Sequence, residues 1–206
     1  EASWLLFIVA SLVLIVTPGQ DMILVMSRSI AQGSRAGVAT AAGVSVGLLG
    51  HTVLATLGLG ALLRTSEWLF LALKLAGAAY LVYLGVQLVR TTKHELAISG
   101  GSPKSAWRLF FDGALSNVCN PKIAVFYFAF LPQFVEPQAA HPTVSIFALG
   151  VAFAVLTFLV KGPVGFGAGA ISGWLRSRPG ALAWLYRTSG AVLIGLGARL
   201  AFERRA

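Results

Sequence analysis

Long apolar stretches separated by short polar ones dominate the chain. Leu5–Val16 is apolar except for Ser11, Ala36–Leu63 holds no acid, lysine or arginine, and Trp68–Val89 contains one charge, at Lys74. A continuous run of roughly 18 or more apolar residues is typical of a helix that spans a bilayer. Membrane strands instead alternate polar and apolar residues over about ten positions. The pattern therefore predicts an all-α integral membrane protein, whose helices satisfy their own backbone hydrogen bonds in lipid.

Six membrane-spanning helices account for these stretches, and two of them are interrupted at a proline. The polar connection Arg90–Arg108 divides the six into two sets of three. We expect them to form a single transmembrane domain over residues 1–206. The predicted spans are Trp4–Met26 (interrupted at Thr17-Pro18-Gly19), Ala36–Leu63, Trp68–Val89, Leu109–Phe134 (interrupted at Asn120-Pro121), Thr143–Ala170 and Leu182–Phe202.

The two sets of helices resemble each other. Each opens with a helix broken at a proline, and each third helix begins with a cation followed by a Gly-Ala step, at Lys74–Ala78 and at Arg187–Ala191. An odd number of helices per set turns the second copy upside down, which is the inverted-repeat plan of many secondary transporters. We predict repeats over 1–89 and 109–206, joined by a cytoplasmic connection over 90–108. Chance similarity among apolar helices is the alternative.

Charge distribution supports a membrane protein and predicts its orientation. Charged residues make up 11% of the chain, against about 25% in soluble domains. The net charge of +9 does not indicate nucleic-acid binding, because the basic residues lie between apolar runs. Positive loop residues mark the cytoplasmic side. The loops after predicted helices 1, 3 and 5 carry nine of them and the other side carries four, so we expect both termini outside: the nine are Arg28, Arg35, Arg90, Lys93, Lys104, Arg108, Arg176, Arg178 and Arg187, and the four are Arg64, Arg199, Arg204 and Arg205.

The first candidate site is the interruption Thr17-Pro18-Gly19-Gln20-Asp21. Proline removes a backbone donor and glycine adds conformational freedom, so a new half-helix should begin here. The N-terminus of such a half-helix carries partial positive charge and attracts anions. A carboxylate within a span, at Asp21, is costly and is a functional hypothesis by default. The alternative is that Asp21 only caps the half-helix at the membrane boundary.

The second candidate site is Asn117-Val118-Cys119-Asn120-Pro121-Lys122. Asn120 can satisfy backbone groups that Pro121 frees. Lys122 stands in the first turn of a half-helix, where the helix dipole disfavours a cation, so it needs an anionic partner. If the two interruptions face each other, that partner is Asp21, which would alternately bind the substrate ammonium or a proton. A purely structural ion pair between helices 1 and 4 is the alternative.

Three further polar residues are weaker candidates for substrate binding. His51 lies on a face of helix 2 with Gly43 and Gly47, where a packing role is the alternative. Tyr80 could line a cavity or simply pack. Lys161 lies just before Pro163, deep enough in helix 5 to need a partner or water. The full set of predicted substrate-binding residues is Thr17, Gly19, Gln20, Asp21, Asn120, Lys122, His51, Tyr80 and Lys161.

Other chemistries find little support in the sequence. No serine has a histidine and a carboxylate at a plausible depth, no His/Cys/Glu cluster has metal-binding spacing, and no P-loop occurs. We therefore expect no enzyme activity, no cofactor and no bound metal. A metal-ion exporter and a membrane enzyme or electron carrier are the alternatives. The first would need clustered ligands, whereas Asp21 and His51 stand alone. A thiol electron carrier would need two cysteines, and Cys119 is the single one.

Together these motifs resemble those of the lysine exporter/homoserine–threonine resistance (LysE/RhtB) family of bacterial amino-acid exporters. The resemblance covers the whole chain. It rests on residues 17–21, on residues 33–37 with Gly43, Gly47 and His51, on Gly77-Ala78-Ala79-Tyr80-Leu81 with Gly85, on residues 120–122, and on Phe130-Leu131-Pro132-Gln133-Phe134. Gln20, where the family usually has proline, and Lys161 depart from the family pattern.

The resemblance implies a multi-pass amino-acid exporter of the bacterial inner membrane, driven by proton antiport. From its position within a span, we expect Asp21 to be the proton-coupling residue. Its partners would be a small amino-acid substrate and the lipid bilayer, and a homodimer is one option for its assembly. A basic substrate should require extra carboxylates in the cavity. Because Asp21 is the one acid clearly inside a span and Lys122 and Lys161 accompany it, we expect a neutral or acidic amino acid or a small derivative instead.

Overall fold

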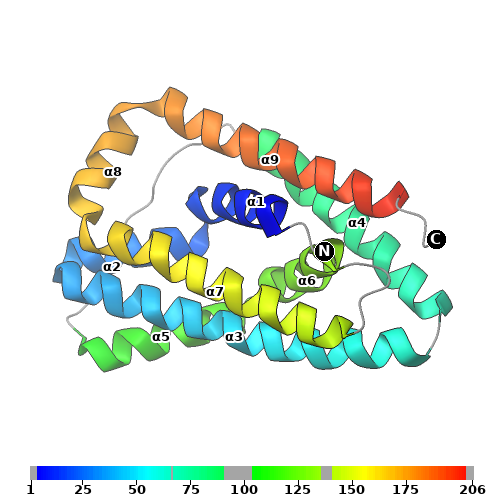
Figure 1. Cartoon of the computed structure of the whole chain (residues 1–206). Helices are drawn as coiled ribbons and strands as arrows, with labels where there is room; N and C mark the ends of the chain where they lie inside the picture. The colour runs from blue at the N-terminus through cyan, green and yellow to red at the C-terminus, as the bar shows by residue number, and fades with distance from the viewer. Residues whose placement is uncertain (1–3, 66, 91–103, 136–140, 203–206) are drawn as a thin grey trace.

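The computed structural model describes residues 4–65, 67–90, 104–135 and 141–202, and every regular element within these ranges is a helix (Figure 1). The connection predicted over 90–108 falls mostly on residues 91–103, outside the described ranges. The helices are α1 (Trp4–Val16), α2 (Gln20–Gln32), α3 (Ser34–Thr65), α4 (Glu67–Arg90), α5 (Ala106–Val118), α6 (Pro121–Phe130), the 3₁₀-helix η1 (Leu131–Phe134), α7 (Pro142–Phe166), α8 (Ala168–Ser177) and α9 (Pro179–Phe202).

Two bends divide the first and fourth predicted spans. α1 and α2 meet at 53° across Thr17-Pro18-Gly19, and α5 makes an angle of 64° with the helical stretch that follows from Lys122. Gly19 caps α2 without a side-chain hydrogen bond, whereas the Asn120 side chain accepts a hydrogen bond from the Lys122 N–H at 3.0 Å. A proline at the first position of α6 fits a helix start, since that N–H has no helical acceptor. Each interruption thus begins a half-helix inside the bundle.

The largest differences from the predicted helix ends are at the ends of α2 and α7. α2 continues past Met26 to Gln32 and stops at Gly33, whose φ of 93° lies in the left-handed region that glycine tolerates. The predicted fifth span, Thr143–Ala170, was wrong at its end: α7 stops at Phe166, and Gly167 donates to the carbonyl of Pro163. A separate helix, α8, then links α7 to α9 at the edge of the bundle (Figure 1). Its Gly-Ala-rich start made it look like a continuation of α7.

Glycines allow several helices to touch through their backbones. A Cβ placed on Gly43 of α3 would lie 1.9 Å from the carbonyl oxygen of Phe110 in α5. Gly37 of α3 and Gly165 of α7 contact each other in the same way, as do Gly85 of α4 and Gly190 of α9. Such small residues let helices approach closely in membranes. α3 therefore packs along both α5 and α7, while α4 and α9 form a second close pair (Figure 1).

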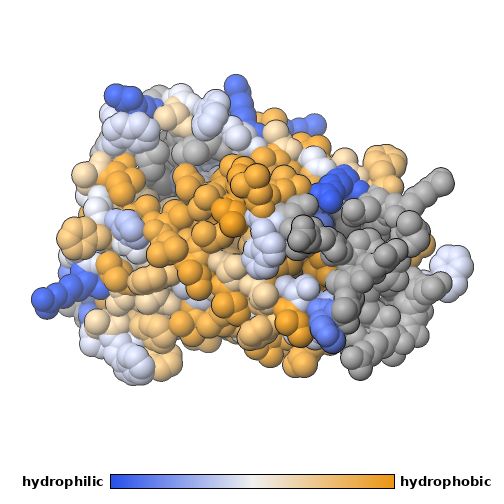
Figure 2. All heavy atoms as spheres, in the orientation of Figure 1, coloured by the Kyte–Doolittle hydropathy of each residue, from blue (hydrophilic) through white to orange (hydrophobic). Residues whose placement is uncertain are grey.

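The outer surface and the interior are both apolar. Figure 2 shows a continuous hydrophobic surface over the middle of the molecule, and exposed side chains include Leu57, Val125 and Leu159. A soluble monomer rarely exposes so large an apolar patch, whereas lipid accommodates one. Within the described residues, α3 over Ser34–Gly58 and α7 are long and apolar enough to cross a bilayer, or up to four spans if each bent pair counts as one. The core contains interlocking aromatic rings from Phe7, Tyr127, Phe130, Phe134 and Phe153.

Candidate functional site

The two helix interruptions lie against each other in the interior of the bundle. Asn120, at the start of α6, donates from Nδ2 to Oε1 of Gln20, at the start of α2, over 3.3 Å. Asn117, in the last turn of α5, donates to Asp21 in the first turn of α2. Residues about 100 positions apart in the chain are thereby joined side chain to side chain. The polar groups of both interruptions therefore form one site.

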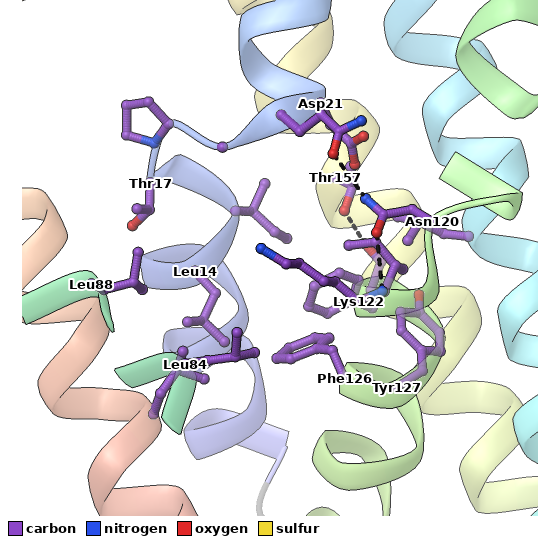
Figure 3. Close-up of a pocket in the computed structure, with 18 of the residues that line it drawn as sticks. Leu14, Thr17, Asp21, Leu84, Leu88, Asn120, Lys122, Phe126, Tyr127 and Thr157 are labelled. Atoms are coloured by element: carbon purple, nitrogen blue, oxygen red, sulfur yellow. Dashed lines mark hydrogen bonds between the residues drawn. The ribbon is translucent and has the colours of Figure 1, made fainter. Parts of the chain in front are cut away.

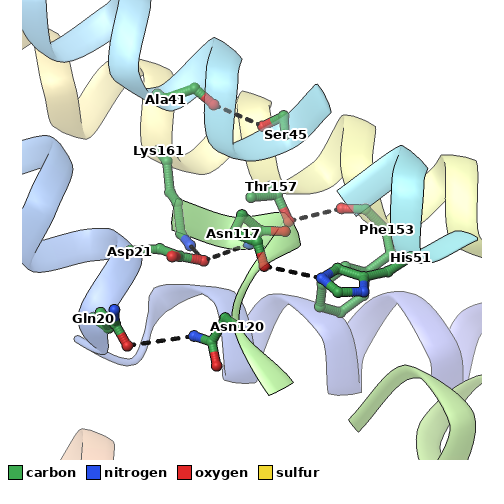
Figure 4. A network of polar contacts seen from close by, with 10 residues as sticks. All are labelled: Gln20, Asp21, Ala41, Ser45, His51, Asn117, Asn120, Phe153, Thr157 and Lys161. Atoms are coloured by element: carbon green, nitrogen blue, oxygen red, sulfur yellow. Dashed lines mark hydrogen bonds and ion pairs between the residues drawn. The ribbon is translucent and has the colours of Figure 1, made fainter. Parts of the chain in front are cut away.

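Asp21 is the centre of a buried polar network (Figure 4). The residue is 7% exposed, and its Oδ2 accepts a hydrogen bond from Asn117 Nδ2 at 2.9 Å. The ammonium of Lys161, on α7, forms an ion pair with the same oxygen at 3.5 Å. Oδ1 is fully buried and has no hydrogen-bond partner within the described residues. A charge buried in this way requires compensation, and Lys161 supplies it.

The ion-pair partner predicted for Asp21 was wrong. The sequence pointed to Lys122, but the structure pairs Asp21 with Lys161, which lies 140 residues further along the chain. Lys122 starts α6 with its side chain exposed toward a cavity (Figure 3). Another acidic residue, Asp112, pairs with Lys104. The ion pairs formed among the described side chains, Lys104–Asp112 and Lys161–Asp21, do not include the ammonium of Lys122.

A cavity of about 370 Å³ opens where the interruptions meet (Figure 3). One part of its wall is polar and the rest is apolar, as expected for a site that orients a small organic ligand. The charged groups in the wall are Asp21, Lys122 and Lys161, two cations and one anion. The polar part consists of Thr17, Gln20, Asp21, Gln87, Asn120, Lys122, Thr157 and Lys161, and the apolar part of Leu14, Ile15, Leu48, Leu84, Leu88, Ile123, Phe126, Phe153 and Leu193, together with Pro18, Gly19 and Tyr127.

Seven of the nine residues predicted to bind substrate line this cavity, and His51 and Tyr80 do not. His51 is buried and donates from Nε2 to the backbone carbonyl of Asn117 at 2.9 Å, so it supports the residue that holds Asp21. Tyr80 donates to the carbonyl of Lys122 at 3.4 Å, at the start of α6. Both residues therefore lie outside the cavity and stabilise, through hydrogen bonds, backbone groups next to its polar wall.

Several residues in the cavity wall or in contact with it escaped the sequence analysis. Asn117 was noted only as part of a motif, yet it is fully buried and contacts Asp21 directly. Its position one turn before Asn120 could have suggested that both side chains reach the same level. Thr157 lies one turn before Lys161 on the same face of α7, and it donates to the carbonyl of Phe153. Gln87 and the leucines carry no comparable signal, because polar and apolar residues at such spacing are common on any helix.

The helix N-terminus of α2 adds to the positive character of the wall. The first N–H groups of a helix have no acceptor within it, and the helix dipole places partial positive charge there. Gly19, Gln20 and Asp21, which form this start, all line the cavity. Within the described residues, no group of three or more His, Cys, Asp or Glu side chains could hold a metal ion. The start of α2 thus favours a ligand with an anionic group.

The chain has relatives among bacterial membrane proteins. A family model described as LysE type translocator matches residues 12–204. The chain is 36% identical over 207 residues to the homoserine/homoserine lactone efflux protein of Salmonella typhimurium, covering 98% of each protein. It is 30% identical over 200 residues to an uncharacterized membrane protein of Pseudomonas aeruginosa, covering 95% of this chain and 93% of that protein. No solved structure matches the chain.

Proposed function

Because the chain belongs to the LysE type translocators, and is thus a multi-pass bacterial membrane transporter and not an enzyme, we propose that it exports amino acids or small amino-acid derivatives from the cytoplasm. The Salmonella relative is named for efflux of homoserine and homoserine lactone, which supports a substrate of this size and chemistry. The proposed location is the bacterial inner membrane.

The observation that carries the proposal is the buried Asp21–Lys161 pair in the wall of the cavity. Ionisable groups are expensive inside a membrane protein and mark substrate or ion pathways there. In secondary transporters, such sites lie where interrupted helices meet. Here the interruptions before α2 and α6 meet at the same cavity, which is large enough for an amino acid. A purely structural pair would have no need of a cavity beside it.

We infer that Asp21 couples export to protons. When the carboxylate is ionised, Lys161 and Asn117 hold it. Protonation would remove its charge and weaken the ion pair, which would loosen the contact of α2 with α7 and α5. The substrate carboxylate would bind Lys122 and the N–H groups at the start of α2, where an anion is favoured. Exchange of a proton for substrate at this junction would constitute antiport.

Neutral substrates suit the cavity better than lysine or arginine. A second cationic group on the substrate would require a carboxylate to receive it, and Asp21 is the one acid among the wall residues. That acid already faces Lys161. Basic amino acids would therefore place further positive charge beside Lys122 and Lys161 without compensation, which is costly in a low-dielectric site.

The proposed topology has six crossings, arranged as inverted repeats over 1–89 and 109–206. α4 and α9 have 24 residues each, about 36 Å at roughly 1.5 Å per residue, which is enough to cross a hydrocarbon core of about 30 Å. Together with α3, α7 and the two bent helix pairs, α4 and α9 would give six membrane crossings. In this arrangement α3 and α7 are the second helices of the two repeats, and α4 and α9 are the third. Each helix packs against its counterpart in the other repeat, which supports the proposed symmetry. The basic loops favour a cytoplasmic 90–108 connection.

Transport by the purified protein in liposomes tests the proposal. Liposomes preloaded with an unlabelled amino acid should take up the labelled form by counterflow, with homoserine and leucine as first substrates and lysine as the comparison. An imposed pH gradient should then drive net movement of the same substrates against their concentration. Liposomes containing Asp21→Asn provide the control for coupling. Absence of counterflow for every amino acid and amino-acid derivative tried would refute export of this substrate class.

A further inference from the structure

The position where a substrate ammonium would bind Asp21 is already occupied. Lys161 and Asn117 both bind Oδ2, at 3.5 Å and 2.9 Å, and Oδ1 is fully buried. A proton needs no room to reach a carboxylate, whereas an ammonium group must displace an existing donor. The Lys161 ammonium also has the chemistry that an α-ammonium would bring. Nothing on Asp21 is therefore left for the amine of an amino acid.

The charge that remains open to a ligand is positive. Asp21 and Lys161 neutralise each other within the wall, which leaves Lys122 as the uncompensated charge of the cavity. The side chain of Lys122 is exposed to the cavity, and neither ion pair of the described side chains includes it. A ligand with one negative charge would complete the charge balance. A zwitterion would bring a cation that has no receiving carboxylate.

The wall beyond Lys122 is apolar and suits an uncharged substituent. Leu14, Leu84, Leu88 and Phe126 surround the far part of the cavity, and Leu193 adds to it. An acyl group on nitrogen removes the charge of the amine and adds apolar surface, which such a wall favours. A free ammonium there would lose its hydration without gaining a partner.

We propose that Lys161 stands in for the substrate's ammonium, so that the site recognises a carboxylate and accepts amino acids whose amine is acylated. This inference rests on the proposed function and narrows its substrate class. The ligand class is a monocarboxylate with an uncharged, largely apolar remainder, of which N-acetylleucine is a simple probe. Lys161 is then a specificity-determining residue, because without it the carboxylate of Asp21 would be free to bind the ammonium group of a substrate.

Counterflow in liposomes with leucine and N-acetylleucine tests the proposal, because counterflow requires no proton gradient. The wild-type protein should exchange N-acetylleucine at least as well as leucine. Lys161→Gln should shift the preference toward leucine by about tenfold, the value of one hydrogen bond to a charged group. The double variant Asp21→Asn/Lys161→Gln should return to the wild-type preference, since it contains neither charge. Lys122→Gln should weaken exchange of both substrates by about tenfold while their ratio stays constant.

Failure of the inference and failure of the proposed function are separable. Wild-type exchange of leucine without N-acetylleucine would overturn the inference and leave amino-acid export standing. An unchanged preference in Lys161→Gln would also overturn it. Exchange of neither substrate, nor of any other amino acid, would remove both. If Lys161→Gln is not recovered as folded protein, the wild-type preference and the double variant still decide the question, because a site that reads an ammonium would reject the acylated substrate.

Discussion

Asn117 Nδ2 lies 2.9 Å from Asp21 Oδ2, so one hydrogen bond joins the last turn of α5 to the first turn of α2. The contact bridges the two places where the chain leaves helical conformation inside the bundle. His51 holds the carbonyl of the same asparagine, and Lys161 holds the same carboxylate oxygen. Four helices, α2, α3, α5 and α7, thus meet through four polar side chains. This arrangement leads to the following expectations.

Asp21→Asn should abolish transport driven by a pH gradient while leaving the protein folded and in the membrane. The amide has almost the shape of the carboxylic acid but cannot exchange a proton, so coupling is lost and counterflow persists. Uptake into inside-out vesicles under an imposed gradient measures the effect. Asp112→Asn, which changes an ion-paired aspartate outside the cavity, is the matched control. Gradient-driven transport at the wild-type rate in Asp21→Asn would reduce Asp21 to a helix-capping role.

Lys161→Met should destabilise the protein by about 3–5 kcal/mol, because it leaves the buried carboxylate of Asp21 without its cation. The double variant Asp21→Asn/Lys161→Met should recover most of that loss, since no unpaired charge remains. Equilibrium unfolding in detergent provides the free energies. Equal stability of the single and double variants would show that Lys161 does not compensate Asp21 in the folded protein.

Asn117→Ala should impair transport although the residue was not among the predicted ligands. The substitution removes one of the two donors to Asp21 Oδ2, at a cost of about 1.5–3 kcal/mol for a hydrogen bond to a charged group. The His51 hydrogen bond, made to the backbone carbonyl, remains available. Leu115→Ala on the exposed face of the same helix is the control. Transport and stability should both fall in Asn117→Ala relative to that control, and equal values would contradict a role for Asn117.

A cysteine at position 100 should resist labelling from outside intact cells. The nine-to-four count of basic residues made from the sequence predicts that the 90–108 connection is cytoplasmic. Gly100→Cys in a Cys119→Ser background should react with an impermeant maleimide only after the cells are opened. Thr65→Cys, at the end of α3, should react in intact cells. The reverse pattern would invert the proposed orientation.

Gly43→Ala should destabilise the bundle by on the order of 1–3 kcal/mol, the usual cost of overpacking a tight contact. The added methyl group would lie 1.9 Å from the carbonyl oxygen of Phe110, a rigid backbone atom, so α3 and α5 would have to separate. Gly195→Ala is the control, because nothing lies within 4 Å of a Cβ at that position. Unfolding in detergent should distinguish the two variants, and similar losses would mean that α3 and α5 can separate without cost.

The class of protein could be predicted from the sequence because it depends on local composition. Apolar stretches such as Ala36–Leu63 leave few alternatives to membrane helices, and α3 covers that stretch from Ser34 to Thr65. The end of α7 could not be predicted, since Ala168–Ser177 continues the same apolar, small-residue composition while turning away as α8. Composition indicates which segments lie in lipid, but it contains little information about where a helix ends and the chain changes direction.

The partner of Asp21 depends on three-dimensional packing, and sequence proximity to an interruption was misleading there. Lys122 was chosen because it follows Pro121, but its place at the start of α6 exposes its side chain to the cavity. Lys161 belongs to another helix, and only the packing of α7 against α2 brings it to the carboxylate. One signal was available: a lysine deep in an apolar helix needs an anion, and the spans offer few acids.

The contact of Gly85 with Gly190 brings the backbones of α4 and α9 directly together. A Cβ on either glycine would lie within 2.6 Å of the other's carbonyl oxygen, so no layer of side chains exists there that could slide or repack. We expect α4 and α9 to move together as one rigid body. This helix pair borders the cavity on one side, through Leu84, Leu88 and Leu193, and the interrupted helices border it on the other. Tilting of this pair against the interrupted helices would therefore change the side of the membrane from which the cavity is accessible.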